Sequence, residues 1–392
     1  MITQRFPPHT GAAARRLGWL VQQYAKAGKV YVIRMGEEAL ELPEVTRTIV
    51  IPNRDIRSVT GQSGKTLPGT IKSNPIVREL LKMRQAFPLV YLTDDGGADY
   101  RNKALAASEQ LIREQKITTI VSSFRPWSDH LVARKLKQRY PHLRWIADFR
   151  DLPVDPVRKD VWWPGLQRWW GKSVIAGADE LWAVSEGQRE QLSPWHPTIK
   201  VVRNPLLSLP PAGNNPVTDR FSISYTGSLY PGLQSVEPLV KALQELLAEG
   251  LMSPEKLCLQ YRGKDAALFR EWTAGLPEAC LDIDAFIAPA AAQEMQRNAQ
   301  VLLLLNWSAP QYYGVLTAKL WDYLASGRPT LALVNGPADP ELTNIISGAA
   351  AGAVFAKNEQ GLADWLRKAY RQWVRNGVLP WATDRENLAQ YL

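Results

Sequence analysis

The sequence contains little of the material from which metal centres and disulfide frameworks are built. Its 392 residues include only two cysteines and four histidines. Cys258 and Cys280 lack the spacing of metal ligands and are too few for a disulfide framework, and no other cluster has the carboxylate or histidine spacing of a metal site. We therefore expect a protein with reduced thiols that uses no metal and no cofactor.

Long apolar runs and targeting signals are also missing. No run approaches the roughly 20 residues needed to span a bilayer, and the N-terminus does not resemble a signal peptide. With 45% hydrophobic and 22% charged residues, the composition is that of an ordinary globular protein without repeats or disordered tracts. We expect a cytoplasmic protein whose membrane contact is peripheral, on the inner face of the cytoplasmic membrane.

The chain is longer than one hydrophobic core usually supports, so we expect two domains. Positive charge is concentrated in the first: residues 1–208 carry 32 Lys and Arg against 20 Asp and Glu, whereas residues 209–392 carry 15 against 18. A basic domain favours anionic partners such as phospholipid head groups or a lipid pyrophosphate. Nucleic acid is disfavoured, because the charge is scattered and no nucleic-acid-binding motif is present.

Strand-like apolar runs alternate with helical patterns, which predicts α/β domains with parallel sheets. A polar, proline-rich segment at residues 204–216 separates two such sets and predicts doubly wound domains at 1–208 and 209–379, with ligands bound in a cleft between them. The expected strands are Lys29–Ile33, Thr118–Ser122, Arg144–Ala147, Glu180–Val184, Phe221–Tyr225, Lys256–Tyr261, Leu281–Ile283, Val301–Leu305 and Thr330–Val334; the helices expected in the first set are Ala12–Ala27, Ala104–Gln115 and His130–Tyr140.

The segment Gly314–Pro329 is the most informative one. It follows an expected buried strand and places a hydroxyl, an ammonium and a carboxylate, those of Thr317, Lys319 and Asp322, on the opening turns of one helix. The N-terminus of a helix attracts phosphate, and Thr317 and Lys319 add a donor and a positive charge, while Asp322 can accept hydrogen bonds from ribose hydroxyls. The alternative is an ordinary amphipathic helix with a solvated Lys–Asp pair.

Two more loops of the second half are candidates for binding a diphosphate. Gly227 and Ser228 directly follow a strand, where a small residue lets backbone N–H groups approach a phosphate. Arg262 and Lys264 follow the next strand and could supply charge to a leaving diphosphate. A ligand-free tight turn and a solvated basic loop are the respective alternatives.

In the first half, several polar residues follow expected strands. His130 begins a helix after a strand, where it could orient a sugar hydroxyl or be a simple helix-start residue, and His9 has a similar claim. Asp148, Arg150 and Asp151 end another strand, and their spacing places two carboxylates around one guanidinium. Asp151 or Arg150 could position an acceptor, or the three could form a structural ion-pair cluster.

Residues 161–172 combine aromatic and basic side chains. Such a mixture suits a membrane interface or a stacked sugar or lipid, although tryptophans can also be absorbed by a core. Adjacent pairs point to opposite sides of any element, which favours partial exposure. The tryptophans are Trp162, Trp163, Trp169 and Trp170, and the basic neighbours are Arg158, Lys159, Arg168 and Lys172. The Asp282–Asp284 pair, in contrast, lies in a strand-like stretch and is assigned to structure.

Taken together, these patterns resemble the family 4 glycosyltransferases of the GT-B fold, especially bacterial enzymes of surface polysaccharide synthesis. The resemblance spans nearly the whole chain. It is carried by an opening loop, an aspartate–arginine–aspartate element, a strand that ends the first domain, a first strand–loop of the second domain and the donor-site helix, which here are Phe6–Arg16, Ala147–Asp151, Ala178–Glu186, Tyr225–Leu229 and Gly314–Pro329. A last segment, Trp381–Ala389, resembles the final family helix, which crosses back onto the first domain, so 380–392 is expected to pack there.

The resemblance implies a retaining glycosyltransferase that moves a sugar from a nucleotide diphosphate to a glycan or lipid-linked acceptor, with leaving-group stabilisation supplying most of the rate. No metal is then required, and domain closure excludes water. Many family members carry two glutamates separated by seven residues; Asp322 occupies the second position and Gly314 the first, so the sugar contact is expected from main-chain N–H groups around Tyr312–Val315.

The expected site follows from these assignments. The catalytic candidates are Lys319, His130 and Asp151; the donor-binding candidates are Gly227, Ser228, Arg262, Lys264, Tyr313, Gly314, Val315, Leu316, Thr317, Lys319 and Asp322; and those of the acceptor side are His9, Gly11, Arg150, Trp162 and Trp163. Two other functions stay open: a nucleotide-sugar epimerase of the same fold, for which no matched carboxylate pair is found, and a degenerate scaffold or binding subunit.

Overall fold

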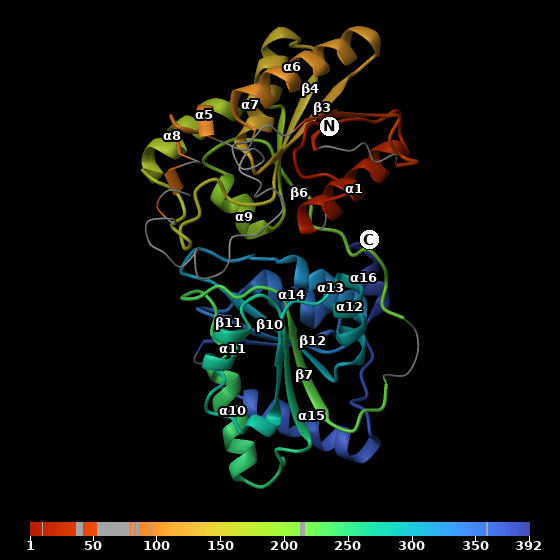
Figure 1. The fold of residues 1–392 in the computed structure, drawn as a ribbon, viewed down its shortest axis with the longest axis vertical. Helices are drawn as coiled ribbons and strands as arrows, with labels where there is room; N and C mark the ends of the chain where they lie inside the picture. The colour runs from red at the N-terminus through yellow and green to blue at the C-terminus, as the bar shows by residue number, and fades with distance from the viewer. Residues whose placement is uncertain are drawn as a thin grey trace. The chain divides into compact units, whose positions relative to one another are not determined.

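A computed structural model describes residues 1–9, 11–36, 42–52, 79, 82–83, 86–93, 96–211, 216–357 and 360–392. The chain divides into two compact units, Met1–Arg203 and Asn204–Leu392. Each unit is an α/β structure built on parallel strands (Figure 1).

The first unit begins with a short bridge at Ile2, which pairs with both Ile33 and Ser122 and so joins two groups of strands into one parallel sheet. The order across this sheet is β2, β1, Ile2, β3, β4, β5 and β6. Its elements are α1 (Ala12–Ala25), β1 (Tyr31–Met35), β2 (Arg47–Ile51), α5 (Val90–Thr93), α6 (Gly97–Glu114), β3 (Thr119–Phe124), α7 (Trp127–Arg139), β4 (Arg144–Phe149), α8 (Pro164–Ile175), β5 (Glu180–Ala183), α9 (Glu186–Leu192) and β6 (Ile199–Val201).

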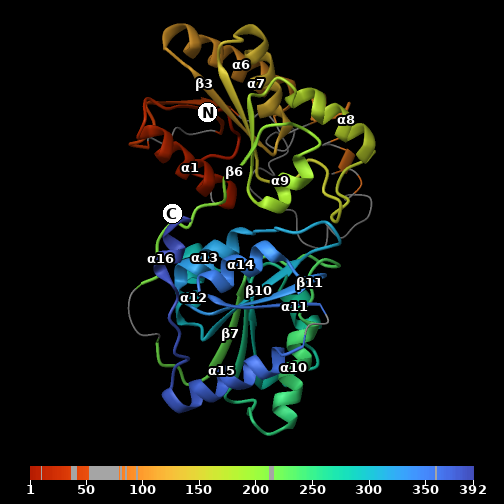
Figure 2. The ribbon, with the colours of Figure 1, turned by 180° about the vertical axis from the view of Figure 1, so that it is seen from behind.

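Both faces of this sheet are covered by helices, as parallel sheets require. Leu17, Leu20 and Val21 of α1 form a core cluster with Val121 of β3 and Ile146 of β4. Helices α6, α7 and α8 lie on the other side of the sheet, as the view from behind shows (Figure 2).

The second unit has the strand order β9, β8, β7, β10, β11, β12, so the order reverses between β7 and β10, as in a doubly wound nucleotide-binding sheet. Its elements are β7 (Phe221–Thr226), α10 (Glu237–Ala248), β8 (Leu257–Arg262), α11 (Ala266–Trp272), a short 3-10 helix (Glu278–Cys280), β9 (Leu281–Asp284), α12 (Pro289–Asn298), β10 (Val301–Trp307), α13 (Ala318–Ser326), β11 (Thr330–Asn335), α14 (Pro340–Gly348), β12 (Gly352–Ala356), α15 (Leu362–Asn376) and α16 (Arg385–Ala389).

Strand β10 explains how the second sheet is buried. All seven of its residues are buried, and successive side chains alternate between two cores. Leu303 and Leu305 join the core under α10, α11 and α15, whereas Leu302 and Leu304 join the one under α13 and α14. Helices α10, α11 and α15 accordingly lie on one side of the sheet, and α12, α13, α14 and α16 on the other (Figure 1).

Residues 380–392 are part of the second unit, where Leu388 of α16 is fully buried in the core under α13 and the Tyr391 ring packs against that of Trp321. The expectation that this segment also packs on the first domain stays a prediction. The division between the units falls at residue 203 rather than 208, because Leu206 is buried in that same core and its N–H donates to the carbonyl of Tyr391.

All nine expected strands are present, with ends shifted by no more than two residues, but β2, β6 and β12 were not expected. These three are sheet-edge strands in which Ile51 alone is fully buried, so they lack the continuous apolar run that identifies a buried strand. Within the described part of the chain, no helix is both long and apolar enough to cross a membrane.

Candidate functional site

The two central strands of the second unit separate toward their carboxyl ends. β7 and β10 pair through only two residue positions, whereas β10 and β11 pair through six. Beyond this short ladder, side chains satisfy the strands: the Gln234 amide donates to the Leu305 carbonyl at 2.7 Å, and the Thr226 N–H donates to the Tyr323 hydroxyl at 3.3 Å. Ligands of doubly wound sheets bind where the strand order reverses, which is this position.

Lys319 lies in the first turn of α13, next to the loop that follows β7. Its ammonium donates to the carbonyl of Ser228 at 3.2 Å and lies 4.9 Å from the centre of the Tyr225 ring. Burial lowers the pKa of Lys319 to about 8, although the nearby carboxylates of Asp265 and Asp322 act to raise it. The structure thus holds a half-buried cation at the point where three candidate segments meet.

Gly227 and Gly263 let these segments approach closely. Gly227 has a φ of +115°, and a β-carbon there would lie 2.6 Å from Cε of Lys319. A β-carbon on Gly263 would lie 2.2 Å from the carbonyl oxygen of Gly227. The Tyr261 hydroxyl donates to that same carbonyl at 2.8 Å and fixes the turn. Gly227 and Ser228 therefore lie beside Lys319, as predicted.

The loop from Ala309 to Thr317 connects β10 to α13 and differs from expectation in one respect. Several of its backbone N–H groups already have acceptors: Tyr312 donates to Ala309, Leu316 to Gly314 and Thr317 to Val315. The N–H of Gly314 donates to Asp339 at 2.9 Å, and that of Val315 also hydrogen-bonds the Asp339 carboxylate. The N–H groups of Tyr312, Gly314 and Val315, which were expected to contact the sugar, are therefore bound within the protein.

Thr317 is the N-cap residue of α13, but its side chain does not cap the helix. Its Oγ1 is buried without a hydrogen-bond partner among the described residues. The first N–H groups of any helix lack i−4 partners inside the helix. In α13 the Leu320 N–H donates back to the Thr317 carbonyl, and the N–H groups of Ala318 and Lys319 lie beside the Lys319 ammonium. Asp322 lies one turn further along the same helix and is half-buried, as expected for a residue on that face.

The two basic residues after β8 have different surroundings. Arg262 donates to the Asp282 carboxylate at 2.7 Å and to the Asp282 carbonyl at 2.8 Å, so it is bound to β9 instead of facing Lys319. The donor-site assignment of Arg262 is corrected on this ground, and the structural assignment of Asp282 is confirmed. Lys264 is exposed. Between them and α11, Asp265 accepts a hydrogen bond from the N–H of Leu229 at 2.9 Å.

Sequence reasoning missed three residues near this position. Tyr230 is 39% exposed, and its ring centre lies 5.3 Å from that of Trp307, at the ends of β7 and β10. Asp339 follows β11 and precedes Pro340, a signal for a helix start that was not used. None of the three belongs to a motif that carries the resemblance, which is why the pattern alone could not identify them.

In the first unit, the aspartate–arginine–aspartate element forms different pairs from those expected. Asp148 binds Arg16 of α1 at 2.6 Å, and both side chains are fully buried. Arg16 also donates to the carbonyls of Val202 and Arg203, at 2.8 and 2.9 Å. This partner, together with the Ser123 hydroxyl, holds the pKa of Asp148 below its usual value against the effect of burial.

Arg150 and Asp151 also have other partners. Arg150 donates to Ser123 Oγ at 3.0 Å and to the Arg125 carbonyl at 2.7 Å. Asp151 accepts from Arg158 at 3.1 Å, and the surrounding arginines lower its pKa despite burial. Arg150 still interacts electrostatically with both Asp148 and Asp151, as the spacing predicts, although it donates hydrogen bonds to Ser123 and Arg125. The Asp151 side chain is 36% exposed, so it stays accessible for the proposed role.

His130 does not reach the surface. It lies in the first turn of α7 and is fully buried, with Nδ1 2.7 Å from the Ser122 hydroxyl and its ring packed against those of Phe124 and Phe149. Burial lowers its pKa to about 3, so the ring is neutral. We correct the catalytic assignment of His130, because the fourth residue of this helix faces the sheet.

The N-terminal segment is held by a buried carboxylate of α7 before the opening loop, and part of the loop itself is exposed. The carboxylate of Asp129, fully buried in α7, accepts from the Gln4 N–H at 3.1 Å and from the Tyr100 hydroxyl at 2.8 Å. His9 and Gly11 are exposed, and Gly11 has a φ of +129° at the start of α1. The pKa of His9 is lowered by partial burial and by the charges of Arg5 and Arg34.

Helix α8 has one exposed aromatic face. Trp163 and Trp169 are 54% and 64% exposed, whereas Trp170 is only 3% exposed and stacks 5.3 Å from Phe87. Trp162 is half-buried and donates from its indole to Glu79 at 2.7 Å. The expected partial exposure is confirmed for Trp163 and Trp169. Exposed basic residues accompany this face, namely Lys159, Arg168 and Lys172.

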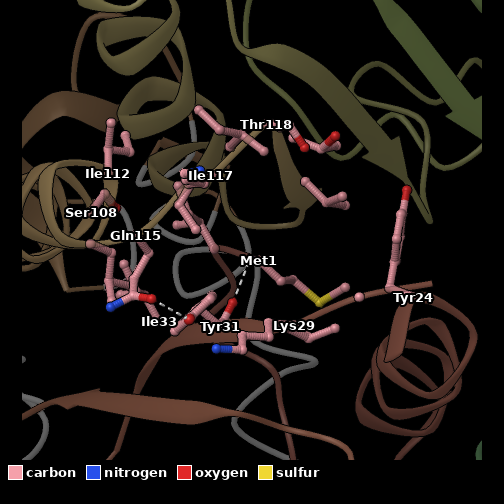
Figure 3. Close-up of a pocket in the computed structure, with 18 of the residues that line it drawn as sticks. Met1, Tyr24, Lys29, Tyr31, Ile33, Ser108, Ile112, Gln115, Ile117 and Thr118 are labelled. Carbon is pink, nitrogen blue, oxygen red and sulfur yellow. Dashed lines mark hydrogen bonds between the residues drawn. The ribbon is translucent and has the colours of Figure 1, made fainter. Parts of the chain in front are cut away.

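A separate cavity of about 750 Å³ lies at the amino ends of β1 and β3, opposite to the carboxyl ends discussed above. Tyr31, Gln115, Ile117 and Tyr24 are among the residues around it, and the Tyr31 hydroxyl donates to the Gln115 amide oxygen at 2.8 Å (Figure 3). No residue of the expected site lies here. Among the residues that the structure describes, no group of three or more His, Cys, Asp or Glu could hold a metal ion.

Comparison with known proteins identifies the fold. No protein-family model matches the sequence, and no curated protein matches it. Among solved structures, WaaG, a glycosyltransferase involved in lipopolysaccharide biosynthesis, is similar with a TM-score of 0.51 and 13% identity, over 100% of this chain and 95% of that chain. TarM is similar with a TM-score of 0.50 and 11% identity, over 75% of this chain and 56% of that chain, so the chain spans little more than half of TarM.

A putative UDP-N-acetylglucosamine 2-epimerase from Listeria monocytogenes is also similar, with a TM-score of 0.50 and 11% identity over 99% of this chain and 93% of that chain. These neighbours share the GT-B fold, and this chain has it as well, with its two Rossmann-like parallel sheets. At such identities the likeness shows the fold.

Proposed function

We propose that this protein is a retaining glycosyltransferase, related to family 4, that transfers a sugar from a nucleotide-diphosphate donor to a glycan or lipid-linked acceptor in bacterial polysaccharide biosynthesis. One observation carries the proposal: the Lys319 ammonium, kept half-buried beside the start of α13 and the Gly227 turn, where the strand order reverses. A diphosphate is the group that this cation and the helix N-terminus fit best.

The donor would be held by the second unit alone. Lys319, the Thr317 hydroxyl and the first N–H groups of α13 would bind the diphosphate, and Asp322 would accept hydrogen bonds from the ribose. As the bond between sugar and diphosphate breaks, negative charge grows on the leaving phosphate oxygen, and a cation already in place stabilises it without reorganisation. We propose that this reaction proceeds without a resident metal or cofactor, because Lys319 provides the charge that a metal would otherwise supply.

The acceptor side is proposed for the first unit, whose excess of basic residues favours an anionic or pyrophosphate-linked acceptor. His9, Gly11, Arg150 and the half-buried Asp151 remain its candidates. Retention of the anomeric configuration would place the acceptor and the departing phosphate on one face of the sugar, so a donor phosphate oxygen would help to remove the acceptor proton.

Ligand binding and product analysis test this function. Thermal shifts and saturation-transfer NMR with UDP-, GDP- and dTDP-linked sugars should identify one donor, and the Lys319→Ala variant should lose its response. Transfer to a lipid-linked or oligosaccharide acceptor, with 1 mM EDTA as a control for metal, should then follow. If the parent protein responds to none of these nucleotides, the proposal is refuted and a scaffold is favoured.

An epimerase is the second candidate, because the Listeria protein of that description has a similar fold. An epimerase would convert the free sugar nucleotide without any acceptor, so one NMR spectrum of the donor incubated with the protein alone distinguishes the two. A new sugar nucleotide in that sample would support epimerisation and refute transfer as the main activity.

We also propose that α8 contacts an anionic membrane surface peripherally. Trp163 and Trp169 are exposed beside three basic residues, a combination that suits the interface between head groups and acyl chains. Sedimentation with phosphatidylglycerol-containing vesicles should fall at least fivefold for the Trp163→Ala/Trp169→Ala variant. The Phe286→Ala variant is the control, because Phe286 is 71% exposed in the other unit. Equal sedimentation of both variants would refute the contact.

A further inference from the structure

Asp339 is a buried carboxylate whose two oxygens bind two different segments. It is fully buried between the end of β11 and the start of α14. Its Oδ1 accepts a hydrogen bond from the N–H of Leu342 at 3.0 Å, which caps α14. Its Oδ2 accepts from the N–H of Gly314 at 2.9 Å, in the loop that precedes α13. One side chain therefore ties the start of one helix to the approach of another.

Capping alone does not account for this arrangement. Asp384 caps α16 through a single oxygen, which accepts from the N–H of Asn387 at 3.0 Å, and it does so at an exposed site. Burying a carboxylate is costly, and burial raises the pKa of Asp339 even though backbone N–H groups of Gly314, Val315, Glu341 and Leu342 all bind it. The second oxygen, which serves the loop, is what an ordinary cap lacks.

The loop that Asp339 holds is the one that delivers the phosphate-binding groups. Its conformation depends on a turn at Gln311, with a φ of 60°, and on Gly314, with a φ of 73°. Three residues after Gly314 the chain reaches Thr317, whose buried hydroxyl has no partner, and two residues later Lys319. By binding the N–H groups of Gly314 and Val315, Asp339 therefore also fixes the position at which α13 begins.

We infer that Asp339 is a positioning residue for donor binding: by holding the N–H groups of Gly314 and Val315, it sets the start of α13 in the place where Thr317 and Lys319 grip a diphosphate. Asp339 does not touch the donor and acts only through the loop. The inference rests on the proposed function, since it concerns the same site.

The Asp339→Ser variant separates the capping of α14 from the hydrogen bonds to the loop. Serine is as good an N-cap as aspartate, so the cap of α14 is retained, but its side chain is too short to reach Gly314 as well. Binding of UDP, GDP, dTDP and inorganic pyrophosphate is measured by calorimetry for the parent, for Asp339→Ser and for the matched cap variant Asp384→Ser. Thermal denaturation and amide hydrogen exchange of residues 312–317 are measured in parallel.

We expect Asp339→Ser to stay folded, to exchange the Gly314 and Val315 amides at least tenfold faster, and to bind the best nucleotide and pyrophosphate at least tenfold more weakly, while Asp384→Ser matches the parent. Unchanged affinity in Asp339→Ser would overturn the inference and leave the proposed function intact. If Asp339→Ser does not fold, Asp339→Asn, which keeps one accepting oxygen, replaces it under the same criteria. A parent protein that binds no nucleotide would refute the proposed function itself, and the inference with it.

Discussion

Replacing Lys319 with methionine should stabilise the protein and weaken donor binding at the same time. Methionine has nearly the same length and shape as the lysine stem, so the packing against Gly227 and the Tyr225 ring is kept. What changes is the charge. In the structure the ammonium donates a hydrogen bond to the Ser228 carbonyl, and the carboxylates of Asp265 and Asp322 act on it only from a distance.

The size of the effect follows from the pKa of Lys319. Burial lowers it from 10.5 to about 8, which corresponds to about 3 kcal/mol of destabilisation when the group is protonated in both states. Because Lys319 keeps part of its surface in water, solvent screening reduces this figure, and we expect Lys319→Met to gain about 1–2 kcal/mol at pH 7.

The effect of Lys319→Met on the free energy of unfolding should depend on pH. The lysine is easier to deprotonate in the folded state than in the unfolded chain, so its cost to stability is fully present below about pH 8 and disappears as the pH rises toward 10.5. The gain of Lys319→Met should therefore be largest near neutral pH and vanish above pH 10.5. Urea denaturation of the parent and of Lys319→Met at several pH values measures the gain in stability and its disappearance at high pH.

Donor affinity should move in the opposite direction. A charge-assisted contact with a phosphate contributes about 1.5–3 kcal/mol, so the dissociation constant of the best nucleoside diphosphate should rise about 10- to 100-fold. A Lys319→Met protein that is less stable than the parent at pH 7, or that binds the donor as well as the parent does, would refute the reasoning that Lys319 is kept for its charge.

Three other substitutions test the remaining geometry. Arg16→Met should cost about 3–5 kcal/mol in urea denaturation, because it leaves the buried Asp148 carboxylate without its cation; a loss below 1 kcal/mol would contradict the buried pair. Gly227→Ala, with its β-carbon 2.6 Å from Lys319, should weaken nucleotide binding more than Gly232→Ala, which also has a positive φ but no atom within 4 Å of its β-carbon; calorimetry that ranks them equally would exclude the contact. Burial lowers the pKa of His130 to about 3, so the parent should lose up to about 4 kcal/mol as the pH falls from 6.5 to 3, and His130→Gln should lose less; parallel stability curves for the two would show that the ring is not buried neutral.

The fold was largely predictable because its central strands are buried on both faces. Val301–Leu305 is apolar at every position, and such a run has few interpretations other than a strand in a parallel sheet. The edge strand β12 is half-buried along its whole length, so its sequence carries no comparable signal. Helix α16 was foreseen as a helix, but the burial of Leu388 in the core of the second unit was not, because that packing depends on residues far away in the sequence.

The features of the candidate site that depend on the local backbone were predictable from the sequence. Those that depend on pairing between distant residues were not. Gly227 and Lys319 were found from local patterns, since a small residue after a strand and a cation at a helix start have local causes. The partners of Asp148 and Arg262 were not found, because Arg16 lies 132 residues from Asp148 and Asp282 pairs through sheet register. His130 faces inward because of the phase of α7, which begins three residues earlier than expected.

The ladder between β7 and β10 is the shortest in the second sheet. Two register positions pair across it, the Gln300 N–H just before β10 donates to the Ser222 carbonyl, and further along the side chains of Gln234 and Tyr323 hydrogen-bond the strands. A molecule bound to both the Gly227 turn, which follows β7, and the start of α13, which follows β10, would therefore link the two halves of the sheet. A ligand bound there would then contribute to the stability of the second unit as well as to its function.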